Sequence, residues 1–196
     1  MALDGKVCYF TFGRFQPPTT GHAESFNSVK RAAGTNDYLL YISQTNDTKG
    51  SNPLPPEVKF SYLKKMFPQH SGKIISGPRD PVAIMQDLMM RGYDEVHFLV
   101  GSDRVNAMKF LHRYNGTEYS FRKIYIESSG SRDADGDTFA ISGTKMRRAA
   151  NDGDFKAFRQ GIPRSLSDQD TRLSLIHISE PTRRRGISYA VFCLKK

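Results

Sequence analysis

Two short segments of this chain hold residue types that bind phosphate groups. The first, residues 13–22, reads GRFQPPTTGH and follows a run of β-branched and aromatic residues, so a strand, a turn and a helix are expected there. Gly13 permits a sharp turn, and Gly21 permits another group to approach the backbone closely. The helix start offers free N–H groups and a partial positive charge to an anion, with His22 in its first turn. Alone, the segment is more typical of an ordinary capped helix start.

The second segment, residues 141–147, reads ISGTKMR and predicts another helix start. Ser142 is a good N-cap, and the backbone N–H groups of Gly143 and Thr144 follow it. Lys145 and Arg147 add positive charge, and the planar fork of an arginine donates two parallel hydrogen bonds to a phosphate. By itself, this pattern fits a solvated basic helix face equally well.

Together, the two segments resemble the two signatures of the nucleotidylyltransferase superfamily. GRFQPPTTGH is similar to the HxGH signature in its GRFxPxHxGH form, and ISGTKMR is similar to ISSTxxR, which binds the β- and γ-phosphates. The superfamily includes nicotinamide-mononucleotide and phosphopantetheine adenylyltransferases and several cytidylyltransferases. The GRF-x-PPT-x-GH pattern is also similar to that of phage-encoded, cytidyltransferase-like proteins. Both signatures occur here in the family's order.

This resemblance implies the transfer of a nucleoside monophosphate from a nucleoside triphosphate to a small phosphorylated acceptor, with release of pyrophosphate. Mg²⁺ would be carried by the triphosphate, with no metal site of the protein's own. His22 and Arg147 would carry most of the catalysis, with Thr19 and Lys49 as further catalytic residues. The nucleotide-binding residues that the resemblance implies are Phe12, Gly13, Arg14, Phe15, Gly21, Gly101, Asp103, Arg104, Ser142, Gly143 and Thr144.

Two of these positions have simpler interpretations. The residues from Gly101 to Arg104 follow a predicted strand and look like the GxD segment of adenylyltransferases, but Asp103 could equally cap a helix. Lys49 resembles the family's mobile lysine near an Asn-Pro pair, although a lone loop lysine is more often solvated. An acidic stretch at residues 132–137 lacks the spacing of a calcium loop.

One departure from the family opens an alternative function. Thr19 stands where the first histidine of HxGH is expected, and a threonine donates one hydrogen bond but carries no positive charge. Turnover should therefore suffer more than nucleotide binding. A catalytically weak or inactive nucleotide-binding module of a phage is the alternative. Within the enzyme hypothesis, GRFQP and ISGT favour ATP, and a CTP-dependent cytidylyltransferase remains an alternative.

Strand and helix patterns alternate along the chain, which predicts a Rossmann-like α/β fold. We expect one domain with a parallel five-stranded sheet and helices on both faces. Ligands of such sheets bind beyond the carboxyl ends of the strands. The expected strands are residues 6–12, 37–43, 73–76, 95–100 and 123–127, and the expected helices are residues 22–33, 55–67, 81–91 and 105–113.

The end of the sequence looks foreign to the protein. Residues 173–196 resemble a translated sequencing adapter, so we expect the enzyme domain to be residues 1–172 and to be truncated at its C-terminus. Residues 1–172 hold 24 basic and 19 acidic side chains, an excess of +5, whereas the whole chain carries +9. The smaller excess of positive charge weakens the argument for a nucleic-acid partner.

Composition places the protein among cytoplasmic enzymes, in the host cytoplasm if it is phage-encoded. The two cysteines suggest neither a disulfide framework nor a metal site. No apolar run is long enough to cross a membrane, and the first residues lack the pattern of a secretion signal. The oligomeric state is not legible from these patterns.

Overall fold

The chain folds into two compact units that interleave along the sequence. The computed structural model describes residues 5–47, 52–78, 80–129 and 142–179. The first unit, here called the sheet unit, draws on residues 1–13, 23–44 and 72–140. The second, here called the motif unit, draws on residues 14–22, 45–71 and 141–196, and it holds the candidate phosphate-binding segments except for Gly13. The predicted domain boundary at residue 172 stays a prediction.

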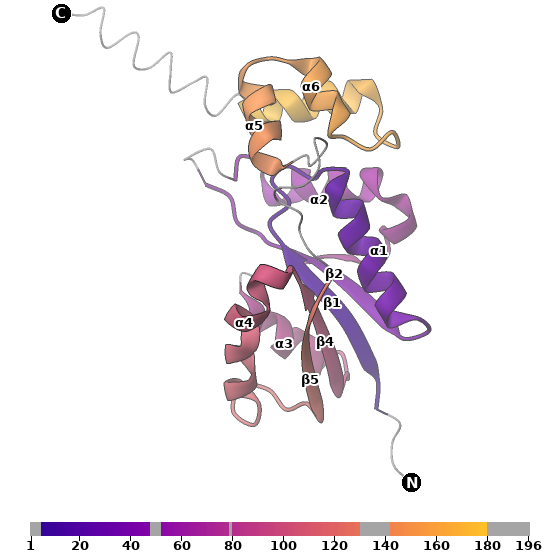
Figure 1. The fold of residues 1–196 in the computed structure, drawn as a ribbon, viewed down its shortest axis with the longest axis vertical. Coiled ribbons are helices and arrows are strands. Elements are labelled where there is room, and N and C mark those ends of the chain that lie inside the picture. Colours follow the sequence, from indigo (N-terminus) through magenta and orange to yellow (C-terminus); the bar gives the residue numbers. More distant parts are fainter. Residues whose placement is uncertain (1–4, 48–51, 79, 130–141, 180–196) are drawn as a thin grey trace, which may run out of the picture. The chain divides into compact units, whose positions relative to one another are not determined.

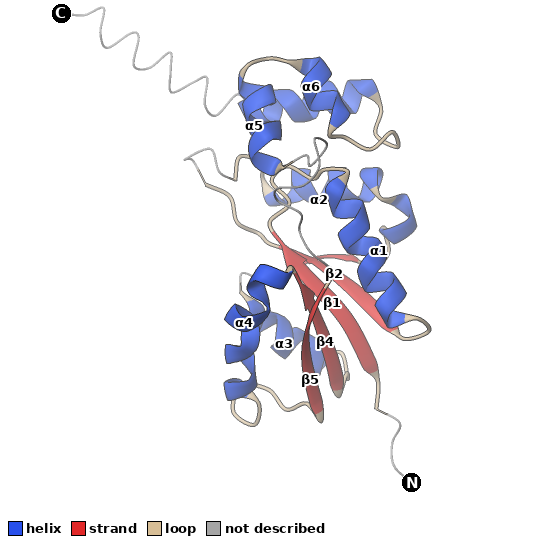
Figure 2. Ribbon diagram, in the orientation of Figure 1, coloured by secondary structure: helices blue, strands red, loops and turns tan. Residues whose placement is uncertain are grey.

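A parallel five-stranded sheet forms the sheet unit, as predicted (Figure 2). Its strand order is β3-β2-β1-β4-β5, and every neighbouring pair is parallel. The carboxyl ends of all five strands therefore lie at one edge. The strands are β1 (Val7–Gly13), β2 (Asp37–Ile42), β3 (Ile74–Ser76), β4 (Glu95–Val100) and β5 (Lys123–Ser128).

Helices cover the two faces of this sheet (Figure 1). On one face, α3 (Pro81–Met90) buries Ile84, Met85 and Leu88 in a cluster with alternate strand residues such as Phe10 and Phe98. On the other face, α1 (Gly21–Ala33) buries Phe26, Val29 and Ala33, the stripe that helical periodicity predicts. The Rossmann-like class is therefore confirmed.

The predicted helix at residues 105–113 is only partly α-helical. It begins as α4 (Val105–Met108) and continues as a 3₁₀ helix, η3 (Lys109–Tyr114). The Tyr119 hydroxyl donates to the Leu111 carbonyl at 2.5 Å, which occupies an acceptor that an α-helix would use. The Asn115 N–H bonds to the His112 carbonyl instead, and this tightens the last turn. The hydrogen bond from Tyr119, which lies outside the helix, therefore accounts for the 3₁₀ geometry of its last turn.

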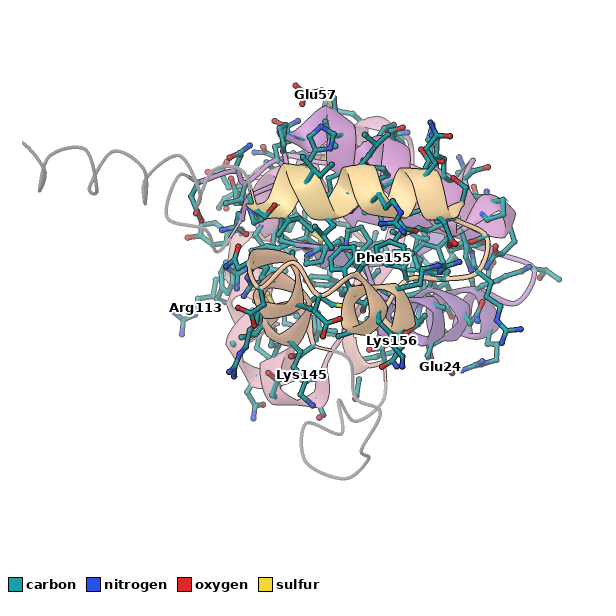
Figure 3. All side chains as sticks on the ribbon, turned by 90° about the horizontal axis from the view of Figure 1, so that it is seen from above. Glu24, Glu57, Arg113, Lys145, Phe155 and Lys156 are labelled. Atoms are coloured by element: carbon teal, nitrogen blue, oxygen red, sulfur yellow. The ribbon has the colours of Figure 1, made fainter. Side chains whose placement is uncertain are left out.

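Helices joined by side-chain hydrogen bonds make up the motif unit. Its elements are α2 (Pro56–Met66), η1 (Pro68–His70), α5 (Gly143–Asn151), α6 (Phe155–Gln160) and a helical stretch at residues 168–179. The Ser165 hydroxyl donates to the Met66 carbonyl at 2.5 Å. Figure 3 shows Phe155 between α6 and that stretch, where the Arg172 guanidinium lies 4.0 Å from its ring centroid. Sequence reasoning predicted neither α6 nor the stretch that follows it.

Part of the suspected foreign tail belongs to this unit. Residues 173–179 continue the helical stretch, with Ser174 and Ile178 buried. The His177 Nδ1 lies 3.2 Å from the Tyr62 hydroxyl. The origin of the tail stays a prediction, because packing does not reveal where a segment was encoded. Among the described helices, none has the length and apolar character to cross a membrane.

The first prediction concerns the core of the sheet unit. Phe10 is fully buried and stacks on Phe98 with ring centroids 4.5 Å apart. We expect Phe10→Ala to lower the free energy of unfolding by about 3–5 kcal/mol, because the cavity loses packing as well as apolar burial. Urea unfolding measures the change, with Met90→Ala at a 76% exposed site as the control. A Phe10→Ala loss no larger than the control's would contradict this core.

A second prediction concerns Lys59, which is fully buried in α2. Burial lowers the pKa of its ammonium group to about 8, below the value of about 10.4 in an unfolded chain. Below pH 8 the folded state therefore carries the whole cost of burying the charge. That cost is relieved between about pH 8 and pH 10.4, as the folded state loses the proton first.

Lys59→Met should therefore be more stable than the wild type at pH 7, and the difference should shrink as the pH rises through this window. Urea unfolding at pH 7, 8, 9 and 10 measures it. Lys156→Met, at an exposed position of α6, is the matched control and should show no such trend. A wild-type minus Lys59→Met difference that is independent of pH would exclude the lowered pKa.

Candidate functional site

The loop at residues 14–22 is buried and strained around Phe15. Phe15 has a φ of 49°, a left-handed conformation that few residues other than glycine adopt. Its side chain is 7% exposed, and its ring meets the His22 ring edge-on at 4.8 Å. Strain of this kind persists only where the surroundings hold it, and such residues cluster at functional sites. The peptide bond that follows Gln16 is cis.

His22 is held through one of its ring nitrogens. The Thr19 backbone N–H donates to Nδ1 at 2.9 Å, and the Thr19 hydroxyl lies 3.1 Å from the same atom. Because Nδ1 accepts from a backbone N–H, the proton of a neutral imidazole belongs on Nε2. His22 is half-exposed, and in this tautomer Nε2 carries the donor of the ring. Thr19 is 2% exposed, and its two contacts with Nδ1 orient the His22 ring, whereas its own catalytic role stays a prediction.

Arg147 is held against the same loop. Its Nη1 donates to the backbone carbonyl of Gln16 at 2.5 Å, and its Nη2 donates to the Thr144 hydroxyl at 3.1 Å. Arg147 lies on α5, whose first turn is capped by the Ser142 hydroxyl, which accepts from the Lys145 N–H at 3.2 Å. Two of the predicted catalytic side chains, those of His22 and Arg147, are therefore hydrogen-bonded to the backbone of one loop.

Gly143 allows α5 to approach this loop closely. A Cβ at Gly143 would lie 3.0 Å from the Gln16 carbonyl oxygen and 3.3 Å from Arg147 Nη1. Both distances are shorter than ordinary van der Waals contact, so a side chain here would push the two apart. No described protein group approaches Gly21 as closely, since a Cβ there would meet only the Thr19 hydroxyl, at 3.7 Å. The close approach of another group at Gly21 therefore stays a prediction.

Positive charge gathers around Arg147. Burial lowers the pKa of its guanidinium, the charge of Arg14 lowers it further, and Asp47 opposes both. An arginine stays protonated in proteins, so the lowered pKa reports mainly the free energy of burying the charge and, second, that of holding it near Arg14. An anion placed between the two cations would offset that cost. The sequence did not predict that Asp47 lies near Arg147, because local sequence does not indicate which distant residues a loop carboxylate will contact.

Gln16 is the second residue that sequence reasoning missed. It was treated as a variable position of the motif, yet its side chain is 5% exposed. Its Nε2 donates to the Leu54 carbonyl at 2.9 Å, and its Oε1 accepts from the Leu54 N–H at 3.0 Å. The partner is 38 positions away in the chain, so no local pattern could have revealed it.

The other predicted site residues that the structure describes lie in the sheet unit. Phe12 and Gly13 end β1, where Gly13 continues the strand and its carbonyl accepts from the Ser43 N–H at 2.9 Å. The sharp turn expected at Gly13 therefore comes later, at Phe15. Gly101 follows β4, and Asp103 and Arg104 form an exposed 3₁₀ turn with an ion pair at 3.9 Å. Asp103 makes no side-chain cap there. Lys49 and residues 132–137 lie outside the described residues.

Known structures share this fold. A protein from Vibrio parahaemolyticus assigned as a nicotinate-nucleotide adenylyltransferase matches with a TM-score of 0.53 and 15% identity, over 87% of this chain and 99% of that one. The Plasmodium falciparum nicotinic acid mononucleotide adenylyltransferase matches with TM-scores of 0.47 complexed with NaAD and 0.46 complexed with APC. Both of these have 14% identity and cover 89% of this chain and 95% of that one. No protein-family model and no curated protein sequence matches the chain. At these identities, the Vibrio likeness shows the fold.

The two cations Arg14 and Arg147 lead to a prediction about the binding of a simple polyphosphate. Inorganic tripolyphosphate should bind, and Arg147→Met should weaken it about ten-fold or more, the scale of a lost hydrogen bond to a charged group. Arg14→Met should cost several-fold at low salt and less at 0.5 M salt, because Arg14 is exposed and its charge is screened. Isothermal titration measures both affinities.

Arg148→Met is the matched control for these variants. Arg148 is the next residue of α5, its side chain is 86% exposed, and it pairs with Asp152. We expect it to bind tripolyphosphate as the wild type does. Equal losses for Arg147→Met and Arg148→Met would reduce the site to general surface charge.

Proposed function

We propose that this protein is a nucleotidylyltransferase. It transfers a nucleoside monophosphate, AMP from ATP, to a small phosphorylated acceptor such as a mononucleotide, and releases pyrophosphate. The observation that carries this proposal is the common support of the two motif side chains. His22 is hydrogen-bonded to the backbone of Thr19, and Arg147 to the backbone of Gln16, within one loop.

The chemistry needs positioning and charge rather than a covalent nucleophile. An oxygen of the acceptor phosphate attacks the α-phosphorus in line, and pyrophosphate leaves as its bond to that phosphorus breaks. His22 Nε2–H and the Arg147 guanidinium would donate to phosphate oxygens on which negative charge grows. Donors that are already in place act most strongly, because no reorganisation is needed at the moment of reaction. The hydrogen bonds from Thr19 and to Gln16 supply this order.

Mg²⁺ fits this site as an ion carried by the nucleotide. Among the described residues, no group of three or more His, Cys, Asp or Glu side chains lies together. In this proposal the triphosphate oxygens would be its main ligands, which suits an ion that retains several waters. When bound, the ion would neutralise part of the triphosphate charge, while Arg14 and Arg147 would meet the rest.

The choice of substrates rests on resemblance. GRFQP and ISGT favour ATP over CTP, and CTP remains the alternative nucleotide. The Vibrio protein of similar fold is named for its action on nicotinate nucleotide. A pyridine mononucleotide is therefore the first acceptor to test with ATP and Mg²⁺. Nucleic acid is a weaker candidate partner, because the excess positive charge is small once residues 173–196 are set aside.

Thr19 motivates a second candidate function, a nucleotide-binding module with little or no catalysis, of phage origin. Thr19 brings no positive charge to the position of the first motif histidine, and its hydrogen bonds go to His22. Such a module would bind ATP or CTP without releasing pyrophosphate. Measuring nucleotide binding and pyrophosphate release on the same sample separates the two functions.

His22→Ala tests the enzyme directly. Loss of a preorganised donor to the transition state costs about two orders of magnitude in rate, and we expect a fall of this size in kcat for pyrophosphate release. The assay is ATP with Mg²⁺ and nicotinic acid mononucleotide. His112→Ala, at an exposed position of η3, is the control and should retain the wild-type rate. An unchanged rate in His22→Ala would remove His22 from the mechanism.

A further inference from the structure

We infer that Gln16 is a positioning residue, which fixes the Arg147 guanidinium for a triphosphate before the nucleotide binds. The ligand in this inference rests on the proposed function, whereas the order imposed on Arg147 does not. Gln16 acts through both its side chain and its backbone. Its side-chain amide anchors the loop, and its backbone carbonyl holds the arginine.

The side-chain amide makes a reciprocal pair with one backbone residue. Gln16 Nε2 donates to the Leu54 carbonyl at 2.9 Å and lies 3.3 Å from the Thr45 carbonyl, while Oε1 accepts from the Leu54 N–H at 3.0 Å. Leu54 is fully buried, so water cannot replace these bonds. Two antiparallel hydrogen bonds between one amide and one residue fix both distance and orientation. A glutamate would lose the donor, and an asparagine is one methylene shorter.

The backbone carbonyl of Gln16 meets Arg147 from the other side. Arg147 Nη1 donates to it at 2.5 Å, and Gly143 leaves the space for this approach. With Gln16 O and Thr144 Oγ1 occupying one N–H on each terminal nitrogen, the guanidinium plane is set. An arginine has five N–H donors, so the others stay available to an anion.

These contacts connect a buried amide with a charged group that carries chemistry. If the Gln16 side chain released Leu54, the peptide that carries the Gln16 carbonyl would be free to reorient. Arg147 would then keep its charge but lose its direction, and it would have to be ordered again each time a triphosphate binds. Such preorganisation strengthens binding and catalysis without adding any contact to the ligand.

A double-mutant cycle on nucleotide binding tests this coupling. The variants are Gln16→Met, which has a similar length without the amide, Arg147→Met, and the pair. Isothermal titration measures the affinity for ATP with Mg²⁺ and for CTP with Mg²⁺. We expect Gln16→Met to weaken binding about ten-fold when Arg147 is present and less than about two-fold when it is absent, a typical coupling between contacting residues. Gln160→Met, at an exposed position of α6, is the control and should change neither affinity.

A second variant approaches the same contact without altering the amide. Gly143→Ala places a methyl group 3.0 Å from the Gln16 carbonyl oxygen. It should weaken nucleotide binding in the same direction as Gln16→Met, again only in the presence of Arg147. If unfolding by urea and by heat shows that Gln16→Met folds poorly, Gly143→Ala still tests the coupling.

The order of Arg147 can also be measured without any nucleotide. In spectra of protein labelled with ¹⁵N-arginine, the Arg147 Nη–H signals are identified by their loss in Arg147→Met. We expect separate signals in the wild type, because its hydrogen bonds slow rotation about the Cζ–Nη bonds. They should merge in Gln16→Met or, in its place, in Gly143→Ala.

The outcomes separate this inference from the proposed function. Equal loss of affinity from Gln16→Met with and without Arg147, or unchanged Arg147 signals in the variants, would overturn the positioning role. A wild type that binds neither ATP nor CTP would overturn the proposed function instead. In that case the arginine signals alone decide whether Gln16 orders Arg147.

Discussion

Two backbone groups of one loop hold the side chains to which we assign the chemistry. The Gln16 carbonyl accepts from Arg147, and the Thr19 N–H donates to His22. The direction of each backbone group depends on what fixes the loop. The left-handed Phe15, the buried Gln16 amide and the bond from the Thr20 N–H to the Gly161 carbonyl, 2.9 Å long, all do so.

The electrostatics of the same region favour an anionic ligand. Arg147 is partly buried and lies in the field of Arg14, and both effects lower the pKa of its guanidinium. Protein interiors tolerate such an arrangement when a partner offsets it, and here Asp47 offsets part. A polyphosphate would offset more, so binding and stability should rise together. The site therefore carries a cost in the free protein that its ligand relieves.

The sequence predicted what depends on local pattern and missed what depends on distant partners. The strand at residues 95–100 was right to the residue, because a strand of a parallel sheet covered on both faces is a continuous apolar run. The buried stripe of Phe26, Val29 and Ala33 was also right, because it follows the helical period. Ser142 caps α5 as predicted. The 3₁₀ turn at η3 follows from a bond by Tyr119, and the role of Gln16 follows from Leu54, 38 positions away. Leu54 lies outside any local window around Gln16, and Tyr119, eight positions after Leu111, lies beyond the helix whose last turn it alters.

In our proposal, His22 and Arg147 bind the same triphosphate molecule. A crystal structure of the protein with Mg²⁺ and a non-hydrolysable ATP analogue tests it most directly. We predict phosphate oxygens of one analogue molecule within hydrogen-bond distance of both His22 Nε2 and the Arg147 guanidinium. A triphosphate that reaches only one of these side chains, or that binds away from the loop at residues 14–22, would contradict the account.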